Sequence, residues 1–264
     1  MKDSANHTVL KTNALSIGYR SKNNESIIAS NITIQLGKGE LIGLVGANGI
    51  GKSTLLRTLT KVQPSISGEI FIGNRPIEDH SSIQLAKALS LVLTEYGFSK
   101  NLTVYELIAL GRHPYTNWIG TLSQNDKNII EKVIGQTGIE NLKEKKCYEL
   151  SDGQLQKVMI ARALAQDTQL IILDEPTTHL DMYHKAYILN LLKKLASDTG
   201  KTILFSSHEI DLAIQLCDKL IVMTEAQVIS GTPKEHISKG SFNNLFPKDL
   251  IVFDVDSGSF KVKK

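Results

Sequence analysis

The segment Gly46–Ser53 combines glycines, one lysine and one serine at a fixed spacing. It reads Gly-Ala-Asn-Gly-Ile-Gly-Lys-Ser and fits the pattern G-x-x-x-x-G-K-[ST]. Glycines let the backbone curl so that its N–H groups point at phosphate oxygens. Lys52 can place a cation on the β and γ phosphates, and the Ser53 hydroxyl can ligate Mg²⁺. The pattern therefore predicts a phosphate loop, with candidate contacts at Gly46, Asn48, Gly49, Gly51, Lys52 and Ser53.

Two further groups could act on a bound phosphate, and each follows a run typical of a buried strand. Asp174 and Glu175 come directly after Leu-Ile-Ile-Leu, and His208 follows Phe-Ser-Ser. Strand ends of this kind face the ligand crevice in open α/β sheets. We expect Asp174 to hold Mg²⁺, Glu175 to orient or deprotonate the attacking water, and His208 to reach the γ phosphate. Without the phosphate loop beside them, the alternative interpretation would be that the two acids are solvated and that the histidine is structural.

The elements that must position these groups are visible as hydrophobic periodicity. An apolar run over 41–45 precedes the phosphate loop, and apolar residues at helical spacing over 53–62 follow it. A strand, a glycine loop and a helix in this order are the context that phosphate binding requires. Further strands are predicted over 31–36, 69–73, 170–173, 202–205 and 219–223, with a turn at 37–40.

Helical patterns dominate the middle of the chain, from about 102 to 165. There, Ser123 with Asp126 three residues later resembles a capping box. An amphipathic helix is predicted over 183–197, between two of the strands, and a hairpin over 251–262. Alternating strands and helices indicate a mainly parallel α/β sheet.

Composition excludes several classes of protein. The chain has 264 residues, of which 41% are hydrophobic and 22% charged, so extensive disorder is excluded. A net charge of +3, spread along the chain, does not favour nucleic-acid binding. The first residues lack the apolar core of a signal peptide, and no apolar run approaches the roughly 18 residues that span a bilayer. Cys147 and Cys217 have no metal or redox spacing, which suits a reducing compartment.

Two additional motifs make a specific family resemblance. Leu150-Ser-Asp-Gly-Gln154 resembles the LSGGQ signature of ABC-type ATPases, and Thr178-His-Leu-Asp181 resembles their D-loop. Tyr19 stands where that family has an aromatic residue stacked on adenine. The resemblance covers about residues 10–230. It implies a phosphate-loop NTPase (RecA-like) α/β fold with a mixed sheet, a helical signature subdomain and an antiparallel β subdomain. The implied organisation is an ATPase domain over 8–240, with a helical insertion at about 98–165, and a short β-rich extension over 241–264.

The same resemblance implies a homodimer across two ATP sites, arranged head to tail. ATP held by Tyr19, Lys52, Ser53 and Thr54 of one copy would meet Ser151, Gly153 and Gln154 of the other, and Asp181 of the D-loop is a further candidate for nucleotide binding. An ordinary helix N-cap is the alternative for Leu150–Gln154.

The sequence departs from the family pattern at two places. Asp152 replaces a signature glycine, and we expect it to point away from phosphate and cap the helix. Thr94 stands where the family has a glutamine that helps to bind Mg²⁺ or water, and whether Thr94 or Glu95 takes that role is open.

Gly111-Arg-His-Pro-Tyr115 resembles a segment of the ATPases that serve importers of ferric siderophores, haem and cobalamin. In those importers the segment docks on a membrane permease, a separate chain that also engages a substrate-binding protein. We expect Arg112, Tyr115 and Trp118 to be exposed anchors, with the protein on the cytoplasmic face of the inner (plasma) membrane. The alternative interpretation of this segment is a surface loop with a buried Trp118. A non-transport ABC ATPase of the repair or translation type is the alternative function, and an exporter subunit is a third.

Overall fold

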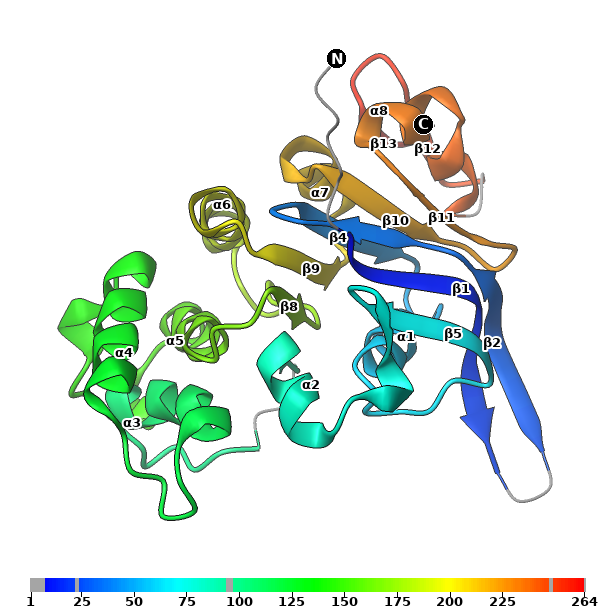
Figure 1. Ribbon diagram of the computed structural model, residues 1–264. Coiled ribbons are helices and arrows are strands. Elements are labelled where there is room, and N and C mark those ends of the chain that lie inside the picture. The colour runs from blue at the N-terminus through cyan, green and yellow to red at the C-terminus, as the bar shows by residue number, and fades with distance from the viewer. Residues whose placement is uncertain (1–7, 22–23, 94–96, 247–248, 264) are drawn as a thin grey trace, which may run out of the picture.

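The computed structural model describes residues 8–21, 24–93, 97–246 and 249–263, and is built around a central sheet (Figure 1). Its strand order is β11-β10-β4-β9-β8-β7, and every neighbouring pair is parallel except β10 with β11. The strands are β4 (Leu41–Gly46), β7 (Leu89–Val92), β8 (Leu170–Leu173), β9 (Thr202–Ser207), β10 (Lys219–Met223) and β11 (Val228–Gly231). The predicted α/β class with a mixed sheet is confirmed.

Both faces of the central sheet are covered, which explains its continuous apolar runs. Side chains on successive residues of a strand point to opposite faces. In β4, Leu41 and Val45 therefore join the core beneath the helices, whereas Ile42 and Leu44 join a second core on the other face. All four side chains are fully buried.

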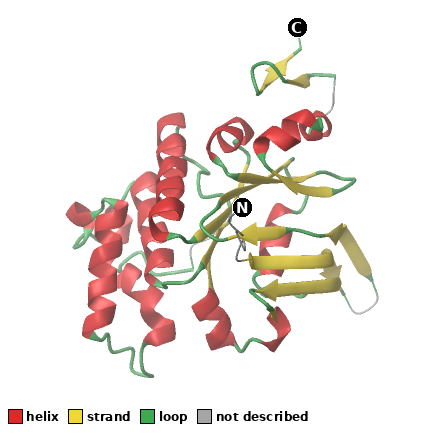
Figure 2. Ribbon diagram, turned by 45° about the horizontal axis from the view of Figure 1, so that its top comes forward, coloured by secondary structure: helices red, strands yellow, loops and turns green. Residues whose placement is uncertain are grey.

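A second, antiparallel sheet packs over that second core (Figure 2). Its strands are β1 (Thr8–Arg20), β2 (Glu25–Ile32), β3 (Gln35–Gly37), β5 (Ser67–Ile72) and β6 (Arg75–Pro76). The sequence did not reveal β1, because register shifts and a positive φ of 44° at Ala14 interrupt its alternation. The single strand predicted over 31–36 is wrong. It is split between β2 and β3, where Asn31 has a φ of 55° and the hydroxyl of Thr12 bonds the backbone of Ile32 and Ile34.

Helix α1 (Lys52–Leu59) lies between the two sheets and buries Leu55, Leu56 and Leu59 in the second core. It ends earlier than the predicted 62, because Lys61 has a φ of 60° and the chain turns. Val62 is consequently 60% exposed. The chain then forms η1 (Ile77–Asp79) and α2 (Ser82–Ala88) before β7.

A group of helices packs beside the sheet, at the left of Figure 1. It comprises α3 (Val104–Ala109), η2 (Leu110–Tyr115), α4 (Gln124–Thr137), η3 (Glu140–Leu142), η4 (Cys147–Glu149) and α5 (Asp152–Ala165). Helices α3, α4 and α5 contact one another and share the core under the sheet. The predicted capping box at Ser123 is confirmed, since Ser123 and Asp126 bond each other's backbone N–H.

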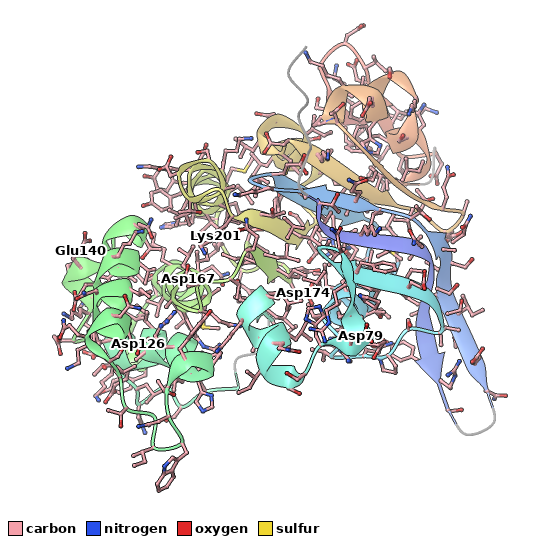
Figure 3. All side chains as sticks on the ribbon, in the orientation of Figure 1. Asp79, Asp126, Glu140, Asp167, Asp174 and Lys201 are labelled. Carbon is pink, nitrogen blue, oxygen red and sulfur yellow. The ribbon has the colours of Figure 1, made fainter. Side chains whose placement is uncertain are left out.

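The expectation that Arg112 is exposed is wrong. Its side chain is 3% exposed, and Nε donates to Oδ1 of Asp126 at 2.8 Å while Nη1 donates to the carbonyl of Ala165 at 2.7 Å. Asp126 is labelled among these helices in Figure 3. The guanidinium carbon lies 4.0 Å from the ring centroid of Tyr115, which is 36% exposed. Arg112 therefore joins three helical segments, whereas Trp118 is 94% exposed as expected.

The C-terminal half completes the layers. Helix α6 (Met182–Thr199) contains the predicted 183–197, and α7 (Ile210–Leu216) packs beside it. After β11 come α8 (Pro233–Ser238), η5 (Ser241–Asn244) and the predicted hairpin, which is formed by β12 (Ile251–Asp254) and β13 (Ser259–Val262). Rings of Phe242, Phe253 and Phe260 hold the hairpin. Within the described residues, no helix has the length and apolar character needed to cross a membrane.

Candidate functional site

A cavity of about 460 Å³ lies at the carboxyl edge of the central sheet, where β4, β8 and β9 end. Strand pairing brings these three chain segments together, although they are far apart in the sequence. The cavity is lined by Tyr19, Ile28, Asn48, Gly49, Gly51, Lys52, Ser53, Thr54, Glu175 and His208. Nine of these ten residues belong to the set that the sequence analysis selected, and Ile28 is the addition.

The loop between β4 and α1 has the curled backbone that its glycines permit. Gly49 and Gly51 have φ values of 75° and 107°, a region that favours glycine. A side chain at Gly51 would also collide with Ile28, since an added Cβ would lie 2.4 Å from its Cγ2. At Gly46 an added Cβ would lie 2.5 Å from the carbonyl oxygen of Met223. Gly49 is therefore required for the turn, Gly46 for close packing, and Gly51 for both.

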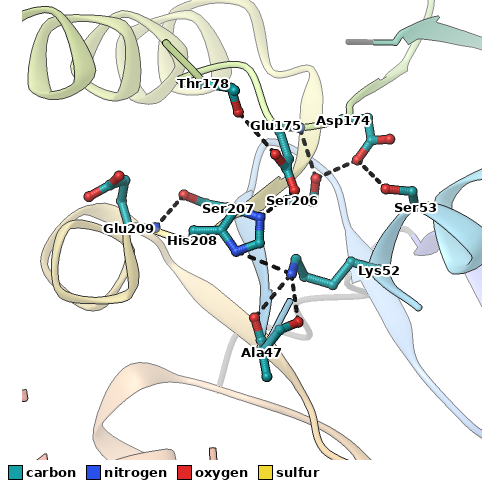
Figure 4. A network of polar contacts seen from close by, with 11 residues as sticks. Ala47, Lys52, Ser53, Asp174, Glu175, Thr178, Ser206, Ser207, His208 and Glu209 are labelled. Carbon is teal, nitrogen blue, oxygen red and sulfur yellow. Dashed lines mark hydrogen bonds and ion pairs between the residues drawn. The ribbon is translucent and has the colours of Figure 1, made fainter. Parts of the chain in front are cut away.

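Lys52 is held inside this loop (Figure 4). Its Nζ donates to the carbonyl oxygens of Gly46 and Ala47, each at 3.0 Å. Burial lowers the pKa of Lys52, and the nearby carboxylates of Glu175 and Asp174 partly oppose that shift. An anion entering the cavity would favour the charged ammonium in the same way as these carboxylates.

The oxygens of Ser53 and Asp174 meet at the other side of the loop. The Ser53 hydroxyl donates to Oδ1 of Asp174 at 3.1 Å, across 121 positions of sequence. Oδ1 also accepts from the hydroxyl of Ser206 at 2.7 Å. Hydroxyl and carboxylate oxygens are ligands that Mg²⁺ accepts, so this pair fits the metal expected there.

Glu175 is fixed through its backbone and both carboxylate oxygens. Its φ of 49° is unusual for a non-glycine residue and typical of strained functional positions. Its N–H donates to Oγ of Ser206 at 2.8 Å, and its Oε2 accepts from the hydroxyl of Thr178 at 3.0 Å. Oε1 lies 2.5 Å from Nε2 of His208. The carboxylate thus has a defined direction into the cavity.

His208 connects the acid with the lysine. Its Nδ1 lies 3.4 Å from Nζ of Lys52, whose ammonium can only donate hydrogen bonds. We therefore assign the acceptor role to Nδ1 and the proton to Nε2, which donates to Glu175. Lys52, His208 and Glu175 therefore form a series of hydrogen bonds in which Lys52 donates to His208 and His208 donates to Glu175.

Two contributors were missed by the sequence analysis. Ser206 bonds Asp174 and the N–H of Glu175, and Thr178 bonds the carboxylate of Glu175. The signal for Ser206 was present, because a serine directly after an apolar strand run and two positions before His208 lies at the same sheet edge. Tyr19, at the end of β1, bonds Thr54 through its hydroxyl at 3.2 Å.

The signature residues lie elsewhere and do not line this cavity. Ser151 is the N-cap of α5, and its hydroxyl accepts from the N–H of Gln154, whose side chain bonds back. Asp152 is exposed in the first helical turn, so the expectation that Asp152 itself caps the helix is wrong. Gly153 is buried in the same turn.

Asp181 is the N-cap of α6 and accepts from the backbone N–H of His184 at 2.8 Å. Thr94 and Glu95 lie outside the described residues.

Comparison with known proteins gives concordant matches. The family model described as "ABC transporter" matches residues 29–178. The achromobactin transport ATP-binding protein CbrD of Dickeya dadantii is 35% identical over 92% of this chain and 89% of its own length. The iron(3+)-hydroxamate import ATP-binding protein FhuC of Bacillus subtilis is 35% identical over 91% of this chain and 88% of its own length. The ATP-binding cassette MJ0796, solved as a dimer in a post-hydrolysis state with ADP and phosphate, is 25% identical, with a TM-score of 0.72 over 85% of this chain and 98% of its own.

Proposed function

Since the chain belongs to the ABC transporter family of ATP-binding proteins, we propose that it is the ATP-hydrolysing subunit of an importer for a ferric siderophore, haem or cobalamin. The observation that carries ATP hydrolysis is the convergence of Lys52, Glu175 and His208 on one cavity. We further propose 8–240 as the ATPase domain, with residues 98–165 as its inserted helical part and 241–264 as an extension.

Hydrolysis would proceed by in-line attack of water on the γ phosphate. The loop N–H groups and Lys52 would bind the phosphates, Tyr19 and Thr54 would contact the nucleotide, and Glu175 would orient or deprotonate the water. The Nε2–H of His208, which donates to Glu175 in this structure, would turn to the γ phosphate or the water when nucleotide binds, because it is the one ring proton in the assigned tautomer. Ser53 and Asp174 would hold Mg²⁺, which neutralises phosphate charge when bound, and Thr94 is a further candidate ligand.

We propose that two copies associate head to tail. The supporting observation is that Ser151, Gly153 and Gln154 lie outside the cavity of their own chain, and Ser151 is exposed at a helix start. N–H groups at a helix start can bind the γ phosphate of another copy. ATP would then join the two copies, and its hydrolysis would release them.

ATP-binding subunits of importers work with membrane permeases, and we propose that the helical lobe of this chain carries the contact. Trp118 is almost fully exposed, on the chain between η2 and α4, and Ile119 beside it is 67% exposed. A large exposed aromatic side chain next to an aliphatic one is typical of an interface hot spot. The working location would be the cytoplasmic face of the membrane, and the permease would engage the substrate-binding protein.

The non-transport alternative lacks comparable support. The relatives reported above carry names of achromobactin transport and iron(3+)-hydroxamate import, and each aligns with about nine-tenths of this chain. The import proposal rests on that full-length similarity together with the site.

The test measures uptake by cells in which the gene is deleted. Uptake of radiolabelled ferric siderophores, haem and cobalamin is compared after complementation with the wild type, Lys52→Ala or Glu175→Gln. We expect the deletion to abolish uptake of one of these chelates, and only the wild type to restore it. Unchanged uptake of all three classes in the deleted strain would refute the proposal. Purified Lys52→Ala should also bind ATP weakly.

A further inference from the structure

Helices α5 and α6 approach each other closely at two places, one in their first turns and one a turn further along. Gly153 on α5 is buried, and a Cβ added to it would lie 3.2 Å from Cδ2 of His184 on α6. One turn further along both helices, Nζ of Lys157 lies 4.1 Å from the ring centroid of Tyr187. A contact at this distance is tighter than most real Cβ contacts, so a side chain at residue 153 would require the His184 ring to shift.

The other edge of the His184 ring is attached to the D-loop. Its Nδ1 lies 2.9 Å from both carboxylate oxygens of Asp181, while its backbone N–H also bonds that carboxylate. The backbone and side-chain hydrogen bonds from His184 lower the pKa of Asp181. Asp181 is therefore an anion at neutral pH, and Nδ1 must carry the proton that it donates.

We propose that His184 is a positioning residue that fixes the signature turn of α5 to the Asp181 end of the D-loop. The two motifs are then presented to a second copy of this chain as one rigid unit. This inference rests on the proposed head-to-tail dimer, because the unit faces a partner only in that arrangement.

The expected benefit is preorganisation. Groups that are already fixed lose less conformational entropy when they are buried in an interface, so association is tighter for the same contacts. His184 is suited to this role because it forms the link through two different edges: a hydrogen bond to one motif and a ring contact with the other. Its side chain is 48% exposed, so it adds little to the core and its loss leaves the fold intact.

The first experiment measures ATP-driven dimerisation by sedimentation, in Glu175→Gln protein with ATP and Mg²⁺. We expect His184→Ala to raise the dimer Kd about tenfold, which corresponds to about 1.4 kcal/mol, while ATP affinity of the monomer stays within about twofold. His184→Asn keeps a hydrogen-bond donor and His184→Phe keeps a ring. The dimer Kd of each should therefore lie between that of the parent and that of His184→Ala. The control is Asn190→Ala, because Asn190 is exposed on the same helix and bonds only the carbonyl of Ala186 among the contacts described for it.

A double-mutant cycle tests the contact itself. Gly153→Ala should weaken the dimer less in the His184→Ala background than alone, because the added methyl no longer meets a ring. Strict additivity would contradict the contact. A dimer Kd for His184→Ala within about twofold of its parent would overturn the proposed positioning role.

A second readout does not depend on the dimer. In hydrogen–deuterium exchange of the isolated chain, amides of the 151–157 segment should exchange faster in His184→Ala than in Asn190→Ala. Equal exchange in both variants would also overturn the proposal. If the Glu175→Gln parent fails to dimerise with ATP, the proposed head-to-tail assembly is refuted, and the exchange experiment still decides whether His184 fixes the signature turn.

Discussion

The hydroxyl of Ser206 donates to Oδ1 of Asp174 at 2.7 Å and so ties the end of β9 to the end of β8. The same hydroxyl oxygen accepts from the backbone N–H of Glu175 at 2.8 Å. One small side chain thereby orients the proposed metal ligand and supports the left-handed backbone of the proposed base. It contacts both strand ends although it does not line the cavity.

Removal of this hydroxyl should slow ATP hydrolysis without preventing folding. Ser206→Ala leaves the N–H of Glu175 and one lone pair of Asp174 without their partner, at a cost of about 1–3 kcal/mol for a buried group. We expect kcat to fall about tenfold, because each 1.4 kcal/mol of lost transition-state stabilisation is one factor of ten. Steady-state ATPase assays check this. Ser207→Ala is the matched control, since Ser207 is equally buried and bonds Glu209 instead.

Replacement of the proposed base should separate binding from turnover. Glu175→Gln keeps the shape of the side chain and removes its basicity, so we expect kcat to fall by about 10³-fold with ATP affinity preserved. The ATP-bound dimer should accumulate and be visible by sedimentation. Glu209→Gln, an acid that pairs with Lys185 nearby, should keep normal turnover. Near-normal hydrolysis by Glu175→Gln would remove that residue from the proposed role.

The buried pair of Arg112 and Asp126 should dominate the stability of the helical lobe. Arg112→Met leaves a buried carboxylate without its cation, and we expect a loss of about 3–5 kcal/mol in the free energy of unfolding. Urea unfolding followed by circular dichroism measures this. Arg112→Met/Asp126→Asn removes the charge but keeps an acceptor for Ser123, so it should recover part of the loss. A double variant as unstable as the single one would contradict this account.

The same pair predicts the direction of an acid effect. Burial alone would raise the pKa of Asp126, but hydrogen bonds from Ser123 and Arg112 outweigh it and lower the pKa below 3.8. The folded protein therefore binds fewer protons at Asp126 than the unfolded chain does. The ionised Asp126 contributes to the free energy of unfolding above about pH 3.8, and this contribution is lost as the pH falls through the lowered pKa. The free energies of unfolding of wild type and Asp126→Asn, measured between about pH 5 and about pH 3, should become more similar as the pH falls.

Trp118 should matter for transport and not for hydrolysis by the isolated chain. Its side chain is 94% exposed, so Trp118→Ala should change stability by no more than about 0.5 kcal/mol and leave basal ATPase activity intact. Uptake in complemented cells should fall, because the substitution removes the side chain proposed to contact the permease. Val255→Ala, also at an exposed apolar residue but in the β12–β13 turn, serves as the control. Normal uptake with Trp118→Ala would exclude that side chain from the docking surface.

The parallel strands and most of the site could be predicted from the sequence because their signals are local. Strand β8 is a continuous apolar run with its acids directly behind it, and the phosphate loop has a fixed spacing. Strand β1 could not be predicted, since its bulges break the alternation that marks a strand. The burial of Arg112 depends on Asp126 and Ala165, which only the packing of the helices brings to it.

The position of β4 between β9 and β10 also constrains the order of assembly during synthesis. Leu41 pairs with Ile203, and Ile42 pairs with Lys219, so the strand that leads into the phosphate loop leaves the ribosome long before its neighbours exist. Until then an apolar strand has two open edges, and unpaired strand edges of this kind favour aggregation. A chain interrupted before β9 cannot form the nucleotide cavity, and nucleotide therefore cannot rescue its folding.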